Sequence, residues 1–373
     1  MIRILAPDDP GVRALKGYVD AGRRGLADVE VADWDGYRDR LERLLAEPTP
    51  SVDAVAVPGH VWLPELAEAG LLAVLEEAAA PERRGVVPSL DVDCRYRGRT
   101  YLMPLFSDGH LVVMRADLVP APGAAPGPEE LLELARAGHD PPGIYGTALK
   151  ASPSEIFLDW LPHYWMAGGR IEADDGVPGL DAGTATRALE SYLALAQLAP
   201  PDTADYGNEE IAAALCEGRV AMAATWGGQA AAIFARPPAG GRFVAVAPRV
   251  PWNAAWGLAV PARHDPARRR AVQATLHELM TPALDERVLA EAGSPVLSAT
   301  YEAASGAPPD GPEGGRYPWL EAQRDMLARA RPLPATPHLD VLLAAVTDAL
   351  ISALRGEASP VEAIAAACRR MLG

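Results

Sequence analysis

Tryptophans that follow apolar, strand-like runs are the residues of this sequence best suited to hold a small molecule. Trp226 ends the run "VAMAAT" and is followed by Gly227 and Gly228. Because glycines lack side chains, a ligand can approach the backbone beside Trp226. An indole ring offers a flat apolar face to the C–H side of a sugar or of another ring. The pattern predicts a ligand platform at Trp226, with a core tryptophan closed over by a glycine turn as the alternative.

Two further tryptophans extend this candidate site. Trp256 lies in the strand-like run "AAWGLAV", at the edge of a predicted strand. Trp165 lies near the end of "EIFLDWLPHYWMAGGRI", residues 155–171, where apolar side chains follow the rhythm of one broad helical face. We expect most of that face to pack in a core and Trp165 to show its edge to the ligand.

The helix that carries Trp165 has start and stop signals of its own. "SPSE" at 152–155 reads as a capping box, with Ser152 as the N-cap and Glu155 reaching back to it. Gly168 and Gly169 supply the stop, and Pro162 predicts a kink. Glu155 is therefore interpreted as a capping residue rather than as a ligand contact.

Polar residues next to predicted strands complete the candidate ligand contacts that residue type and position indicate. Asp8 and His60 follow the strand-like runs at 2–7 and 52–59, so we expect them at the carboxyl ends of two strands in the first part of the chain. Asp108 and His110 lie amid apolar neighbours within 95–118, where a satisfied hydrogen-bond network at a hinge is the alternative to ligand binding.

Motifs for catalysis and for metal binding are missing. Neither Lys16 nor Lys150, the only lysines, has the context of a phosphate-binding loop, and no G-x-S-x-G or H-E-x-x-H run occurs. The three cysteines are far apart, which excludes a disulfide framework and a clustered metal site. We therefore favour a binding protein over an enzyme and expect folding to require no metal or organic cofactor. The scarcity of lysine is interpreted as the bias of a GC-rich genome.

Composition excludes further classes of protein. A net charge of −16, with a pI near 4.9, argues against binding to nucleic acid phosphates. The longest apolar runs are interrupted before about 18 residues, so we expect no membrane-spanning helix. The start "MIRILAPDDPGV" reads as a strand entering a turn. We expect an extracytoplasmic protein if a signal was removed, or a cytoplasmic one if Met1 is the native start.

The order of elements predicts an α/β protein. Strand-like runs at 2–7, 27–34 and 52–59 alternate with helical patterns, one of them over 63–77, which is typical of a mostly parallel sheet. The segment 95–118 reads as two strands joined by a turn at "SDG", and the Pro/Gly/Ala-rich stretch at 121–128 suggests a crossing between lobes. At 373 residues the chain exceeds one ordinary core.

The same pieces, taken in order, resemble a known family. "VDAVAVPGHVWLPELAEAGLLAVLEE" is similar to the first ligand loop and helix of the extracellular solute-binding proteins of ABC transporters, sugar-binding group. "RGRTYLMPLFSDGHLVVMRADLV" resembles that family's crossing strand. "WMAGGRI", "EGRVAMAATWGG", "WGLAVP", "ARP" at 330–332 and "GEASPVEAIAAA" follow in the family's order.

The resemblance implies a periplasmic binding protein type II fold, with two α/β lobes, a hinge and an interlobe cleft. It implies a first lobe of residues 1–115 plus 253–300 and a second of 116–252 plus 301–373. It also implies a monomer that captures a small, carbohydrate-like ligand for ABC-type uptake, with a permease as its partner. By its motif Arg331 joins the candidate ligand contacts, with a salt-bridged surface arginine as the alternative.

Two other functions remain open at this point. A cytosolic protein of the same fold could serve a biosynthetic pathway as an enzyme or as a binder of an intermediate. A sensor subunit could bind the ligand and dock on a receptor. The sequence does not identify the ligand, because acidic, amino and neutral sugars use overlapping residue types.

Overall fold

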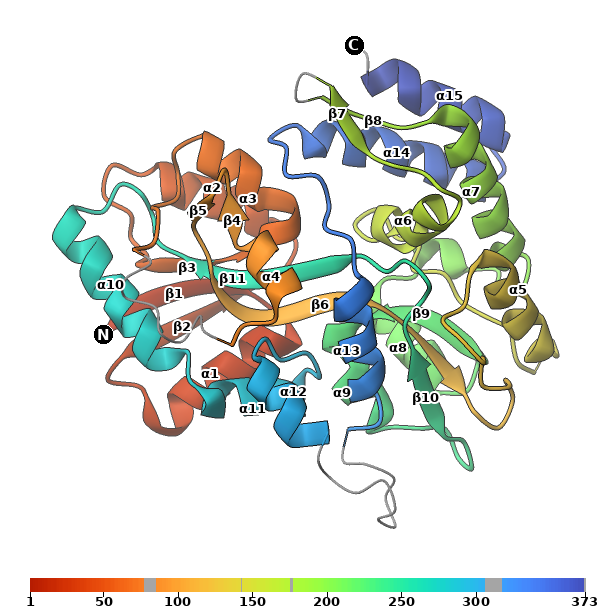
Figure 1. Ribbon diagram of the computed structural model, residues 1–373, viewed down its shortest axis with the longest axis horizontal. Helices are drawn as coiled ribbons and strands as arrows, with labels where there is room; N and C mark the ends of the chain where they lie inside the picture. Colours follow the sequence, from red (N-terminus) through yellow and green to blue (C-terminus); the bar gives the residue numbers. More distant parts are fainter. Residues whose placement is uncertain (77–84, 142, 175–176, 306–316, 372–373) are drawn as a thin grey trace. The chain divides into compact units, whose positions relative to one another are not determined.

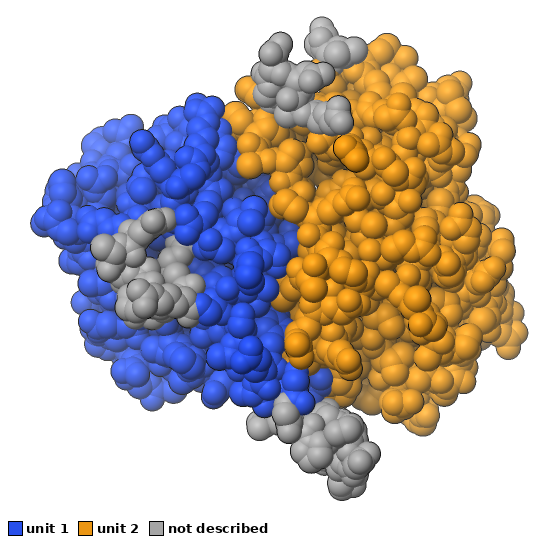
Figure 2. All heavy atoms as spheres, in the orientation of Figure 1, with its two compact units in different colours: residues 1–108, 253–317 blue, residues 109–252, 318–373 orange. Residues whose placement is uncertain are grey.

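The computed structural model describes residues 1–76, 85–141, 143–174, 177–305 and 317–371. These residues form two compact units, each built from two separate stretches of chain. Unit 1 consists of residues 1–108 and 253–317, and unit 2 consists of residues 109–252 and 318–373 (Figure 2). The first division falls inside a strand, between Asp108 and Gly109, rather than in the Pro/Gly/Ala-rich stretch at 121–128, which lies in unit 2.

Unit 1 is a sheet flanked by helices (Figure 1). Its strands in spatial order are β2 (Ala27–Ala32), β1 (Ile2–Pro7), β3 (Ala54–Pro58) and β11 (Asn253–Ala259). Its helices are α1 (Pro10–Gly22), α2 (Tyr37–Ala46), α3 (Gly59–Glu68), α4 (Pro88–Asp93), α10 (Pro266–Leu279), α11 (Pro282–Glu291) and α12 (Ser298–Ser305). A two-stranded ribbon is formed by β4 (Arg95–Tyr96) and β5 (Arg99–Thr100).

Strand directions in unit 1 only partly match the expected parallel sheet. β1 pairs in parallel with β2 and with β3, as expected for strands joined through helices. β11 pairs antiparallel with β3. The chain order allows this direction, because β11 begins where the chain returns from unit 2, after Trp252. It is therefore not joined to β3 by a single crossover helix, as the parallel strands are joined.

Helix α1 shows why the local sequence folds as it does. The Asp9 side chain caps the helix by accepting from the Gly11 amide, and Pro10 occupies the first helical position. Val12, Leu15 and Val19 repeat at helical spacing and are buried in the core of unit 1.

One long strand, β6 (Met103–Arg115), replaces the two strands and the turn that were expected within 95–118. Every residue of β6 is buried, including the expected turn Ser107–Gly109. The Ser107 hydroxyl lies 3.2 Å from the carbonyl of Pro295, and a Cβ on Gly109 would lie 2.3 Å from Met326 Cε. Small residues are present here because their neighbours are close, so the turn signal was misleading.

Unit 2 is built around the second half of β6. Both β9 (Met222–Trp226) and β10 (Phe243–Val246) pair antiparallel with it. Short strands β7 (Glu172–Asp174) and β8 (Val177–Gly179) form a ribbon. The helices are α5 (Pro128–Ala137), α6 (Ile156–Met166), α7 (Ala182–Ala196), η3 (Thr203–Asp205), α8 (Asn208–Cys216), η4 (Gly227–Gln229), α9 (Ala230–Phe234), α13 (Leu320–Arg329), α14 (Leu339–Leu354) and α15 (Pro360–Met371).

Two predicted helix boundaries were wrong. The helix expected over 63–77 begins at Gly59 and ends at Glu68, because Gly70 adopts φ +66° and Leu72 bridges to Pro261; residue 77 lies outside the described ranges. α6 begins at Ile156 rather than directly after Ser152. Before it lies a turn in which the Ser152 carbonyl accepts from the amides of Glu155 and Ile156. By contrast, the same Ser-Pro-x-Glu pattern at Ser359 does start α15.

Candidate ligand-binding site

Unit 1 carries a cluster of three tryptophans. Trp34 follows β2, Trp62 lies on α3 and Trp256 lies in β11. The Trp34 and Trp62 rings stack with centroids 5.9 Å apart, and Trp256 meets Trp34 edge-on at 5.8 Å. Trp34 is 43% exposed although it stacks on Trp62. The cluster therefore presents an aromatic surface to solvent, with Trp34 as its outermost ring.

Strand register explains how three distant segments bring these rings together. Trp256 of β11 pairs with Pro58 at the carboxyl end of β3, directly before α3 begins at Gly59. Trp62 is therefore in the first turns of that helix. β2 and β3 both run parallel to β1, so their carboxyl ends lie on one edge of the sheet. This edge is where α/β sheets place their ligands.

The charged groups around Trp34 suit hydroxyl recognition. Asp33 and Asp35 flank it in the sequence and are exposed. The Arg38 guanidinium lies 5.5 Å from the Trp62 ring centroid and forms ion pairs with carboxylates on α2 and α3. An aromatic face beside carboxylate acceptors is the arrangement that a polyhydroxylated ring or chain requires.

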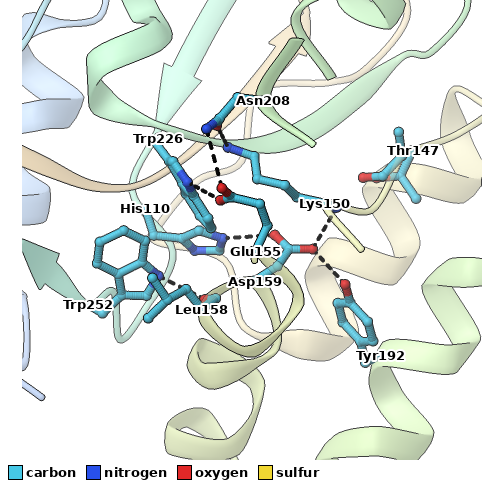
Figure 3. A network of polar contacts seen from close by, with 11 residues as sticks. His110, Thr147, Lys150, Glu155, Leu158, Asp159, Tyr192, Asn208, Trp226 and Trp252 are labelled. Atoms are coloured by element: carbon cyan, nitrogen blue, oxygen red, sulfur yellow. Dashed lines mark hydrogen bonds and ion pairs between the residues drawn. The ribbon is translucent and has the colours of Figure 1, made fainter. Parts of the chain in front are cut away.

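Unit 2 contains a compact polar network around Trp226 (Figure 3). The Trp226 indole donates to a Glu155 carboxylate oxygen at 2.5 Å. The Lys150 ammonium lies 3.5 Å from the Trp226 ring centroid and donates to Asn208 Oδ1 at 2.6 Å. The Asn208 amide in turn donates to Glu155 at 3.5 Å. These four side chains form a closed cycle of contacts.

A second part of the network centres on Asp159, one helical turn beyond Glu155. Its carboxylate accepts from the Lys150 backbone amide at 3.0 Å and from the Tyr192 hydroxyl at 2.7 Å. His110 Nε2 lies 3.4 Å from the other oxygen. These contacts provide partners for a buried carboxylate, which would otherwise be costly.

Burial controls protonation in this network. It raises the pKa of Glu155, while the Lys150 ammonium opposes that rise and the like charge of Asp159 adds to it. Burial also lowers the pKa of His163, one turn beyond Asp159, to about 4. His163 is therefore neutral near pH 7, and the network holds one buried ammonium against two carboxyl groups.

The predicted residues of unit 1 fall in different surroundings. Asp8 is exposed and pairs with Arg13 at 2.7 Å, which lowers the pKa of its carboxyl. Burial lowers the pKa of His60 to about 3, and Asp108 is buried on β6. Trp256 is the one that joins the aromatic cluster.

In unit 2 the structure brings together two predicted residues that lie far apart in the sequence. The Arg331 guanidinium lies 6.0 Å from the Trp165 ring centroid. Arg331 is exposed, whereas Trp165 is largely buried. The exposed guanidinium therefore lies near a ring that is itself mostly covered by the protein, at the outer limit of a cation–π contact.

Trp226 and the two glycines beside it have close protein neighbours. Trp226 is 5% exposed, and Trp252 meets it edge-on at 4.8 Å. β9, which Trp226 ends, is antiparallel to its neighbour, so the expected parallel-sheet crevice is not its setting. A Cβ on Gly227 would lie 2.6 Å from the Gln323 side chain, which gives that glycine a packing role; Gly228 is also buried. These contacts favour the core alternative, and ligand binding at Trp226 stays a prediction.

Sequence reasoning missed several residues of both clusters. Trp34 stood at a recognised strand end, and that position was a usable signal. Trp62 gave none, because only the register of β3 with β11 places it beside Trp34. Glu155 was interpreted as a helix cap, whereas its side chain accepts from Trp226. The scarcity of lysine was attributed to genome composition, and Lys150, which is wholly buried, was not considered further.

Features that would indicate other classes of protein are not found in the described ranges. No helix there is long and apolar enough to cross a membrane. The same residues contain no group of three His, Cys, Asp or Glu side chains arranged to hold a metal ion.

Comparisons with solved structures show the fold. A solute-binding protein of an ABC transporter from Agrobacterium radiobacter K84, in complex with ribitol, matches with a TM-score of 0.84 and 21% identity, over 99% of this chain and 97% of that one. Maltose-bound MalE3 of T. maritima matches with a TM-score of 0.82 and 18% identity, over 100% of this chain and 99% of that one. A solute-binding protein of Thermotoga lettingae bound to α-D-tagatose matches with a TM-score of 0.83 and 20% identity, over 100% of this chain and 99% of that one.

These matches confirm the two-lobed fold of periplasmic binding proteins of type II that the sequence predicted. A comparison with curated proteins found no match. The family model described as bacterial extracellular solute-binding protein matches residues 27–274, which is most of the chain. The chain therefore belongs to the family of bacterial extracellular solute-binding proteins.

Proposed function

We propose that this protein binds a neutral sugar or polyol and delivers it for ABC-type uptake. The observation that carries the proposal is the exposed Trp34 ring, stacked on Trp62 and flanked by Asp33 and Asp35. A stacked indole contacts the C–H face of a sugar, and carboxylates accept its hydroxyl protons. Structural neighbours in complex with ribitol, maltose and α-D-tagatose support the same ligand class.

The stack also provides rigidity. Trp62 is held between Trp34 and Tyr37, with Arg38 close to its ring. A platform that is ordered before the ligand arrives loses little conformational freedom on binding. Truncating its outermost ring should then cost about 1–3 kcal/mol of binding free energy, the scale of one large buried aromatic contact.

A thermal-shift screen with ribitol, D-mannitol, maltose and D-tagatose tests the proposal. Ligand at about 100 times its dissociation constant adds roughly 2.7 kcal/mol to the free energy of unfolding, which a melting curve resolves. Trp34→Ala should abolish the shift at moderate ligand concentration, and Trp34→Phe should keep part of it. The exposed Val92→Ala serves as the control variant. If no compound of the four shifts the wild type, or if Trp34→Ala binds as the wild type does, the proposal is wrong.

Partner, location and assembly state belong to the same proposal, and membership of the family supports them. We place the protein outside the cytoplasmic membrane, as a monomer that docks on an ABC permease. Light scattering during gel filtration measures the mass, for which 39.4 kDa is expected of a monomer. Cell fractionation with an antibody tests the location. A dimer, or a protein found only with the cytoplasm, would count against these assignments.

A further inference from the structure

Lys150 is unusual in the composition of this chain. Lys16 and Lys150 are the only lysines among 34 basic residues, and all the others are arginine. Lys16 lies on the surface of α1 and pairs with Asp20 at 3.5 Å. Lys150, in contrast, is fully buried. A buried lysine, in a chain whose basic residues are nearly all arginine, raises the question of whether a guanidinium could meet the requirement there.

The geometry around Lys150 shows what that requirement is. Its ammonium lies 3.5 Å from the centroid of the Trp226 ring and 2.6 Å from Asn208 Oδ1. A compact point charge fits between a ring face and one acceptor, whereas a planar guanidinium with five donors does not. The same ammonium is the nearby positive charge that acts on the Glu155 carboxylate. Lys150 therefore contacts or influences all three other members of the cycle.

The members of the network differ in burial. Lys150 and Trp226 are buried, while Glu155 and Asn208 are each partly exposed. Glu155 offers carboxylate oxygens, and Asn208 offers an amide. Both groups are held from behind, by the Trp226 indole and by the Lys150 ammonium respectively. This partly exposed pair can meet hydroxyl groups without having to reorganise.

We propose that Lys150 is a positioning residue whose ammonium balances the Glu155 carboxylate and holds Glu155 and Asn208, beside the buried Trp226, for contact with neutral hydroxyl groups. The assignment rests on the proposed function, in which the ligand is a neutral sugar or polyol. Asp159 adds a second negative charge nearby, but its oxygens are engaged by Tyr192, His110 and the Lys150 amide. Removing the ammonium leaves Glu155 as an uncompensated carboxylate, and an ammonium on a ligand can then take its place.

The first experiment needs no ligand. Lys150→Met keeps a long side chain but removes its positive charge. Glu155→Gln removes the opposite charge, and the double variant removes both. In Lys150→Met the folded-state pKa of Glu155 rises further above its unfolded value. The folded form then gains stability relative to the wild type as the pH falls toward this raised pKa, where Glu155 takes up a proton. The double variant has no such carboxyl and should lack this pH dependence.

The second experiment measures selectivity with D-glucitol and D-glucamine, which differ by one hydroxyl replaced by an ammonium. Wild type should prefer D-glucitol. Lys150→Met should shift the affinity ratio toward D-glucamine by about tenfold or more, and the double variant should not. A lysine that only supports the fold would weaken both compounds equally. Val361→Ala, an exposed change on α15, is the control.

The two experiments distinguish a failure of the proposed function from a failure of the role proposed for Lys150. If wild type binds neither compound, nor any sugar or polyol of the thermal-shift screen, the proposed function fails, and the stability profile alone decides the role of Lys150. A Lys150→Met profile that runs parallel to the wild type from pH 8 to pH 5 overturns the positioning role. An unchanged affinity ratio overturns the effect on selectivity.

Discussion

The hydroxyl of Tyr192 donates a 2.7 Å hydrogen bond to the carboxylate of Asp159, which joins α7 to α6 inside unit 2. Both side chains are buried, so the bond forms in a medium of low polarity. It also helps to fix the helix that carries Glu155 at its start. The polar network and the packing of this unit therefore depend on each other.

Replacing Tyr192 by Phe should lower the free energy of unfolding by about 1.5–3 kcal/mol, because a buried carboxylate loses one of its donors. Tyr18→Phe is the matched comparison, since its hydroxyl meets the neutral Thr281 hydroxyl at 2.9 Å nearer the surface. Urea denaturation measures both. An effect at Tyr192 no larger than the effect at Tyr18 would show that Asp159 does not depend on this bond.

Gly109→Ala should destabilise unit 2 by about 1–3 kcal/mol through overpacking. The new Cβ would lie 2.3 Å from Met326 Cε and 2.5 Å from its Sδ. Shortening that neighbour should relieve the strain, so Gly109→Ala with Met326→Ala should cost less than the sum of the single changes. Gly22→Ala, which meets open space, is the control. Additive costs in thermal or urea unfolding would contradict this packing argument.

Acid should destabilise the protein partly through His163. Burial lowers its folded-state pKa to about 4, below an unfolded value near 6.5. The unfolded chain therefore binds a proton first, and stability is lost as the pH falls from about 6.5 to about 4. His163→Gln should flatten the stability curve in this interval relative to the wild type. Urea midpoints at several pH values provide the measurement, and parallel curves would refute it.

Asp285 should be important for the loop that follows α11. Its carboxylate accepts from the backbone amides of Val296 at 2.7 Å and Leu297 at 3.1 Å, and from the Thr300 hydroxyl at 2.5 Å. Asp285→Ala leaves two amides without their acceptor and should cost about 2–5 kcal/mol. Thr300→Val removes a single donor and should cost about 1 kcal/mol. Equal effects in calorimetry would mean that the amides find other partners.

Trp226→Ala should weaken ligand binding by about 1–3 kcal/mol if Trp226 belongs to the ligand platform. Trp226→Phe keeps a ring beside Lys150 but removes the donor to Glu155. Titration calorimetry with the tightest compound of the screen compares the two variants. Unchanged affinity, or a Trp226→Ala variant that does not fold, assigns Trp226 to the core.

Much of unit 1 could be predicted from the sequence, because its signals are local. The runs at 2–7 and 52–59 became β1 and β3, and the segment after Asp9 became α1. In each case hydrophobic spacing and a capping or strand signal point to one conformation. The same locality explains why a ligand edge near Trp34 was recognisable, while its stacking with Trp62 was not.

Two copies of one motif show most clearly what the sequence determined and what it left open. Ser-Pro-x-Glu at Ser359 and at Ser152 predicts the same capping box, and at Ser359 the local bonds form. At Ser152 the carboxylate of Glu155 accepts instead from Trp226, which is 71 residues away in the chain. The sequence by itself determined the alternation of strands and helices and the family. Only the tertiary structure decided which polar groups meet, because a buried donor takes the acceptor that folding brings close to it.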